Sequence, residues 1–264
     1  MNEVIVYFFA VFIGITLGLV GAGGSILTVP VLVYLIGIEP ILATSYSLFI
    51  VGITSLFGVI TKFKQGNIDI KTALLFSTPS LLSIYYTRKI IIPSIPDIII
   101  NYNGLTVSKN TTLMVLFSII MFFSALSMIG LKKQKLKIKE RKNNILNITI
   151  EGILVGILSG LIGVGGGFII IPALILFSGL SMKKAVGTSL MIISIKSLVG
   201  FAGDISNSFN ISWDFLFFFS FLSVIGILIG SYGGRNIKGN KLKKIFGYFI
   251  LIISLFIIFK EIIE

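Results

Sequence analysis

The residues best suited to chemistry in this sequence are two glycine-rich segments, 18–30 and 160–172, each lying inside an apolar stretch. Neighbouring glycines let backbone N–H groups converge into a small concave site for an anion. The helix that follows each segment would point its positive dipole end at the same place. These segments therefore predict a small-anion site, although glycines that only allow close helix packing are the alternative.

Side chains near the segments could add to such a site. Hydroxyl groups follow each segment, and they could bind an anion or only bond to their own helix. Lys196 lies inside an apolar stretch, about 10 Å from its outer end by helical rise. Charges at such depth are usually functional, and snorkelling to the interface is the alternative. The predicted substrate-binding residues are Gly21, Gly23, Gly24, Ser25, Thr44, Ser47, Gly163, Gly165, Gly166, Gly167, Thr188, Ser189 and Lys196.

The two segments belong to a longer internal repeat. Residues 18–58 and 160–200 align without a gap at a constant offset of 142 residues, and 16 of the 41 pairs are identical. Glycine, proline and serine are all among the identical pairs, as in Gly21 with Gly163. Two unrelated apolar stretches would share far fewer residues, so we infer an internal duplication.

The composition is that of a polytopic helical membrane protein. Hydrophobic residues make up 55% of the chain and charged residues 12%, whereas a soluble domain has about 25% charged residues. The net charge of +12 does not indicate a nucleic-acid partner, because Lys and Arg lie in short loops between apolar runs. The chain has no Cys or His, so neither a His-activated nucleophile nor a zinc site can be assembled. We expect no enzyme activity and no cofactor.

The apolar runs predict an all-α fold built from two repeats. Each repeat has a hairpin broken at its glycines and three transmembrane helices. The first repeat covers 1–131, with runs at 2–20, 26–37, 41–61, 72–87 and 111–131. A basic linker covers 132–147. The second repeat covers 148–264, with runs at 148–163, 168–180, 185–203, 213–233 and 245–262.

Loop charges give an orientation. The basic linker is expected in the cytoplasm, and walking along the chain from it places the 88–110 loop outside. Equivalent loops of the two halves then carry opposite charge, since Lys62 and Lys64 correspond to Asp204. This pattern predicts repeats of inverted topology, as in many secondary transporters.

The second broken hairpin begins after the cytoplasmic linker and ends at Lys183 and Lys184, so it must enter and leave on one side. Its arms of about 13 residues are about 20 Å long, too short for a hydrocarbon core of about 30 Å. We therefore predict re-entrant hairpins from opposite faces, with both glycine turns near the membrane midplane. The first hairpin stays open, because residues 2–20 are long enough to cross.

The sequence resembles the TauE/SafE sulfite exporter family, also called TSUP, over nearly its whole length. The resemblance rests on the paired Gly-Leu-x-Gly-x-Gly-Gly…Pro segments and on three shorter motifs. These are Ala-Val-Gly-Thr-Ser-Leu at 185–190, Gly-Asn-Ile-Asp at 66–69 and Gly-Ser-Tyr-Gly-Gly-Arg at 230–235. Residues 77–83 depart from the family pattern, with serines where glycines are usual. The resemblance implies transport of sulfite, sulfonates or related small organic anions.

The sequence thus predicts a secondary transporter of a small, sulfur-containing anion in the bacterial cytoplasmic membrane. An anion channel on the same scaffold and a non-transporting membrane protein are the alternatives. The expected partners are a small anionic substrate and the lipid bilayer, with a homodimer left open and no nucleic acid.

The predicted orientation can be tested by thiol labelling, because the chain has no native Cys. In intact cells, an impermeant reagent should label a cysteine that replaces Asn207 and should not label one that replaces Gln134. Labelling at 134 but not at 207 would invert the topology.

Overall fold

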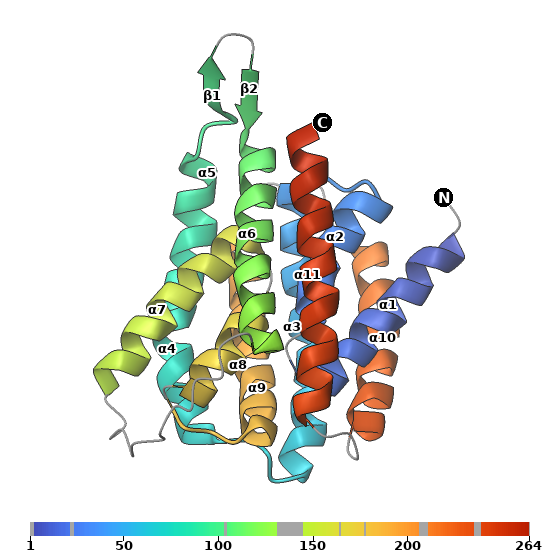
Figure 1. Cartoon of the computed structure of the whole chain (residues 1–264), viewed down its shortest axis with the longest axis vertical. Helices are drawn as coiled ribbons and strands as arrows, with labels where there is room; N and C mark the ends of the chain where they lie inside the picture. Colours follow the sequence, from blue (N-terminus) through green and yellow to red (C-terminus); the bar gives the residue numbers. More distant parts are fainter. Residues whose placement is uncertain are drawn as a thin grey trace.

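The computed structural model describes residues 3–21, 24–102, 105–130, 145–163, 165–176, 178–205, 211–234 and 239–263. Within these ranges the protein is a helical bundle with one short two-stranded sheet (Figure 1). The elements before the linker are α1 (Glu3–Val20), α2 (Ser25–Pro30), the π-helical segment η1 (Val31–Leu35), α3 (Pro40–Lys64), α4 (Ile70–Tyr86), the π-helical segment η2 (Thr87–Ile91), α5 (Ile92–Ser94), β1 (Ile98–Tyr102), β2 (Leu105–Ser108) and α6 (Lys109–Ile129). Those after it are α7 (Ile145–Ile162), α8 (Gly167–Leu176), α9 (Met182–Ile205), α10 (Trp213–Gly233) and α11 (Gly239–Ile263).

Helix lengths and composition confirm a polytopic helical membrane protein. Among the described residues, α3, α6, α9 and α10 are each long and apolar enough to cross a membrane. Shorter apolar helices lie on either side of the glycine breaks among the described residues. The predicted apolar runs therefore correspond to helices, and the helices are interrupted at the glycines as predicted.

The long helices begin and end at residues suited to that purpose. Pro40 opens α3, where its missing N–H costs nothing. Asp69 caps α4 by accepting a hydrogen bond from the Thr72 N–H at 2.9 Å. Ser108 caps α6 in the same way, and Gly130 ends α6 in the left-handed conformation.

Both broken hairpins fold back toward the end of the bundle from which they enter. In Figure 1, α7 rises from the lower end, and α9 begins at that end after α8 has returned. The first hairpin enters at the upper end, near the C-terminus and the β1–β2 hairpin. There the Tyr34 hydroxyl donates to Glu261 near the end of α11, and Glu39 before α3 accepts from Asn110 in α6. The first hairpin therefore folds back, as the second does.

The two halves exchange their packing partners. Helix α1 of the first half packs against α10 of the second, and α7 of the second half packs against α4 of the first. At the centre α3 packs on α9, and on another side α6 packs on α11. Every one of these pairings joins the two halves, so neither half forms a separate core.

Individual contacts are exchanged between the halves in the same way. A contact between two residues recurs between their counterparts 142 positions away in the sequence repeat. Gly21 packs on Val186, and the corresponding Gly163 packs on Thr44, the residue that corresponds to Val186. In the same way Gly58 contacts Leu190, and Gly200 contacts Leu48. These reciprocal contacts support two repeats related by a twofold axis, while their inversion across a membrane stays a prediction.

The 88–110 segment differs from the external loop that we predicted. The helical segments η2 and α5 continue α4 as far as Ser94, and β1 and β2 then form an antiparallel hairpin. The sequence carries an Asn-Gly pair at 103–104, a frequent hairpin signal that the hydropathy pattern does not reveal. As a result Arg88 lies in a helix and is completely buried, and its placement in an external loop was wrong.

Glycines bring α1 and α10 into close contact. Added side chains at Gly14 and Gly18 would meet the backbone of α10, and those at Gly226 and Gly230 would meet the backbone of α1. Gly226 and Gly230 therefore form a packing face of α10. In the equivalent α7–α4 pair, only α7 contributes glycines, which pack on Pro79 and the serines of α4.

Replacing Gly226 with alanine should therefore destabilise the protein. The new methyl group would meet the Val11 carbonyl and lie 2.9 Å from the Ile15 nitrogen, and such overpacking costs about 1–3 kcal/mol. Gly233→Ala is the control, since nothing lies within 4 Å of that position in the same helix. Equal melting temperatures of the two variants in detergent would contradict the packing role.

Candidate functional site

The second glycine turn, residues 163–166 between α7 and α8, is the centre of the candidate site. Gly163 and Gly166 have φ angles of +70° and +68°, a region where residues with side chains are strained. Added side chains would also collide with neighbours. A Cβ on Gly166 would overlap the Ser159 hydroxyl and lie 2.8 Å from Nζ of Lys196. A Cβ on Gly165 would lie 2.8 Å from the Ser197 hydroxyl. Polar side chains are thus packed directly onto the turn.

Lys196 is the cation at one end of this turn. Its side chain is 0% exposed, and Nζ donates a hydrogen bond to the Ser159 hydroxyl at 2.8 Å. Lys196 therefore does not snorkel to the interface. Lys196 belongs to α9, the helix that packs on α3 at the centre of the bundle. Among the described residues no carboxylate pairs with Lys196, since the ion pair found there joins Arg88 and Asp204.

Two serines at repeat-related positions are buried, and one of them contacts this turn. Ser55 in α3 and Ser197 in α9 are both 0% exposed. Their hydroxyls have no hydrogen-bond partner within the part of the chain that the structure describes, and the same holds for the predicted site residue Ser47. A buried hydroxyl without a partner costs free energy. Of these three, Ser197 faces the glycine turn, where a bound ligand would satisfy it.

A buried ion pair borders the other end of the turn. Nη1 of Arg88 lies 3.2 Å from Oδ2 of Asp204 and donates to Oγ1 of Thr44 at 3.0 Å. The Ser45 hydroxyl donates to the same oxygen of Asp204. Arg88 also contacts Gly163, because an added Cβ there would overlap Nη2. The turn therefore has Lys196 near Gly166 and Arg88 at Gly163.

Sequence reasoning missed both members of this ion pair. Arg88 directly follows the apolar run 72–87, and Asp204 directly follows the run 185–203, so each was assigned to a loop. In the structure Asp204 lies in the last turn of α9 and is 1% exposed. One signal was available in the sequence. Arg88 and Asp204 carry opposite charges, and both follow apolar runs that are expected to end on the outer side of the membrane.

The predicted residues of the first turn have a different geometry. Gly21 has a φ of +82° and packs on Val186. Gly24 has a φ of −68°, a value that residues with side chains also adopt. Its missing side chain makes room for Ile13 and Leu17 of α1. Gly23 lies outside the described residues. The atoms nearest to an added Cβ at Gly21 and at Gly24 all belong to apolar residues, namely Val186, Ile13 and Leu17.

The remaining predicted residues divide between the two ends of the bundle. Thr44 lies at the second turn, as described above. Thr188 accepts a hydrogen bond from the Asp69 N–H at 2.9 Å, and Ser189 donates to the Val186 carbonyl at 2.8 Å. Both hydroxyls thus have structural partners near the start of α9. Ser25 and Gly167 begin α2 and α8, and both are buried.

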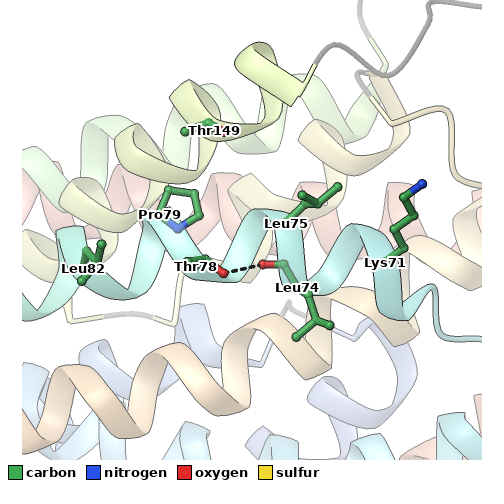
Figure 2. A pocket seen from close by; sticks show the side chains of 7 residues that line it. All are labelled: Lys71, Leu74, Leu75, Thr78, Pro79, Leu82 and Thr149. Carbon is green, nitrogen blue, oxygen red and sulfur yellow. Dashed lines mark hydrogen bonds between the residues drawn. The ribbon is translucent and has the colours of Figure 1, made fainter.

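A cavity of about 600 Å³ lies elsewhere, between α4 and the start of α7 (Figure 2). In Figure 2 the Thr78 hydroxyl bonds to the Leu74 carbonyl of its own helix, at 2.9 Å. Three of its seven lining residues are leucines, and Leu82 is 72% exposed. The lining residues are Lys71, Leu74, Leu75, Thr78, Pro79, Leu82 and Thr149. None of them is a predicted site residue.

Comparisons with known proteins agree with the transporter prediction. The family profile of the sulfite exporter TauE/SafE matches residues 6–257. A protein named "Probable membrane transporter protein" from Xylella fastidiosa is 24% identical over 256 residues, covering 94% of this chain and 92% of the relative. "Probable membrane transporter protein YdhB" from Bacillus subtilis is 27% identical over 225 residues, or 85% of each chain.

A relative from Methanocaldococcus jannaschii, also named a probable membrane transporter protein, is 29% identical over 194 residues. That match covers 71% of this chain and 67% of the relative. No solved structure shows a significant match. Because the family profile covers nearly the whole chain, this protein belongs to the TauE/SafE sulfite exporter family.

Proposed function

We propose that this membrane transporter is a secondary carrier for a small anion such as sulfite, a sulfonate or a related sulfur-containing organic anion. The observation that carries the proposal is Lys196, a completely buried cation packed against a glycine turn with no carboxylate partner among the described residues. A buried charge without an opposite charge is costly. A bound anion would remove that cost.

The surroundings of Lys196 fit an oxyanion. The Ser197 hydroxyl at Gly165 has no partner within the described residues, and it could donate to a ligand oxygen. Helix α8 begins directly after the turn and has 10 residues, so its N-terminal N–H groups favour negative charge at the same place. A site made of one cation, hydroxyls and backbone N–H groups suits the oxygens of a sulfonate, sulfite or carboxylate.

Both halves of the chain contribute to this site, which supports a carrier. Thr44 and Arg88 from the first half contact Gly163 of the second half. If the halves move relative to each other, the site is opened and closed by that movement, as alternating access requires. We further propose that the two repeats are inverted across a bacterial cytoplasmic membrane, as the loop charges predict, and that the protein catalyses no reaction. An anion channel is the second candidate on the same scaffold.

Transport by purified protein in liposomes tests the proposal. Sulfite inside should drive saturable uptake of external sulfite, and Lys196→Met should reduce binding roughly tenfold to hundredfold, the loss expected for a charged hydrogen bond. Lys196→Arg should keep more affinity, because it keeps the charge. The control is Lys244→Met, which removes an exposed lysine near the start of α11. An ohmic current would identify a channel, and normal affinity in Lys196→Met would refute the site.

The glycine turn offers a second prediction that separates the anion site from backbone strain. Gly166→Ala and Gly179→Ala both place a side chain at positive φ, with φ angles of +68° and +63°, at a cost on the order of 1 kcal/mol. Nothing lies within 4 Å of an added Cβ at Gly179, whereas one at Gly166 meets Ser159 and Lys196.

Only Gly166→Ala should therefore lose affinity for sulfite. Both variants should melt at lower temperatures, and Gly166→Ala should melt lower than Gly179→Ala because its methyl group also displaces Ser159. Affinity and melting temperature would be measured on the same detergent-purified samples. Equal affinities in the two alanine variants would show that the turn does not bind the anion.

A further inference from the structure

The buried Arg88–Asp204 pair carries an inference that rests on the anion-transport function proposed above. Arg88 is 0% exposed and Asp204 is 1% exposed. The guanidinium packs on Gly163, the residue at which the turn begins. The same turn ends at Gly166, three residues after Gly163, and Lys196 contacts Gly166. Two buried cations therefore border one glycine turn, one at each end.

The charged side chains that the structure describes at this turn do not balance. Arg88 and Lys196 carry two positive charges, and Asp204 carries one negative charge. The three side chains together leave a net charge of +1 in a region shielded from water. A small monoanion would make the cluster neutral, and this favours a ligand with a single negative charge spread over two or more oxygens.

We propose that Arg88 is a second substrate-binding cation and that Asp204 is an internal carboxylate that the substrate displaces from it. The ligand class is a small monoanion with an oxygen-rich head group, such as a sulfonate, hydrogen sulfite or a carboxylate. A guanidinium presents its N–H groups as a planar fork that binds two oxygens of such a head group at once. The ion pair joins Nη1 to Oδ2 at 3.2 Å, a longer contact than a typical charge-assisted hydrogen bond.

The surroundings of Asp204 allow this exchange. Its Oδ2 accepts a hydrogen bond from Ser45 as well as from Arg88. When an anion replaces Asp204 as the partner of Arg88, the Asp204 carboxylate still accepts a hydrogen bond from the Ser45 hydroxyl. On the other side, Thr44 holds Nη1 of Arg88 at 3.0 Å, so the cation keeps its position beside Gly163.

The exchange also links substrate binding to movement of the two halves. Arg88, Thr44 and Ser45 belong to the first half, and Asp204 belongs to the second. The ion pair therefore links the two halves at the C-terminal end of α9. An anion that displaces Asp204 from Arg88 therefore breaks this ion pair between the halves when it binds.

Four variants test the proposal, with methanesulfonate as the probe and calorimetry on detergent-purified protein. Asp204→Asn keeps an acceptor for Ser45 but removes the competing charge, so it should tighten binding by roughly tenfold. Arg88→Gln should weaken binding by at least roughly tenfold. The Arg88→Gln/Asp204→Asn double variant removes both charges. It should fold even if Arg88→Gln does not, and it should still bind weakly. Lys89→Gln is the matched control, since Lys89 is the exposed neighbour of Arg88.

The outcomes separate this inference from the proposed function. Wild-type affinity in the double variant would show that the pair is only structural, and unchanged or weaker binding by Asp204→Asn would show that Asp204 does not compete with the anion. Either result, with Lys196→Met still defective, overturns the inference and leaves the transport function standing. If wild-type protein binds neither methanesulfonate nor sulfite, the proposed function fails and this inference fails with it.

Discussion

The structure depends on one constraint, which is that irregular backbone inside an apolar environment must be enclosed by protein. A glycine turn has N–H and C=O groups without helical partners, and hydrocarbon cannot satisfy them. In this chain the cover comes from the opposite half, since Val186 of α9 lies on Gly21 and Thr44 of α3 lies on Gly163. The crossing of α3 and α9 at the centre is therefore the feature that makes both breaks tolerable.

The scaffold is close to symmetric, but its charges are not. At the repeat offset the partner of Lys196 is Thr54, whose hydroxyl only bonds to the Ile50 carbonyl at 2.6 Å. The partner of Asp204 is Lys62, which is also buried. Among the described residues, the buried cations Lys196 and Arg88 both contact the second turn. This asymmetry is why the anion site proposed above is assigned to the second turn.

The sequence predicted the helices well, because hydrophobic runs and charges at their ends are local signals. The run 213–233 has the same bounds as α10, and the run 41–61 lies within α3. Hydropathy could not predict that Arg88 continues a helix, since the charge that compensates it, on Asp204, lies far away in the sequence. Nor could the shared glycine motif reveal that Gly24 and Gly166 differ in φ. That difference depends on what packs on each glycine: α1 side chains on Gly24, but Ser159 and Lys196 on Gly166. The inverted orientation and the anion remain predictions.

The exchanged packing of α1 on α10 and of α7 on α4 has a consequence for biogenesis. Translation delivers α1 to the membrane before α9 and α10 have left the ribosome, so the turn at Gly21 has no cover from the second half while it waits. The first half therefore cannot reach its final structure when it is inserted. Its hairpin must stay bound to the insertion machinery or lie at the lipid surface until the second half is made. Native structure forms only after the last helices arrive, and a polypeptide that ends within the linker would be a substrate for membrane proteases. If the two halves were encoded by separate genes, each product would need the other as an obligate partner.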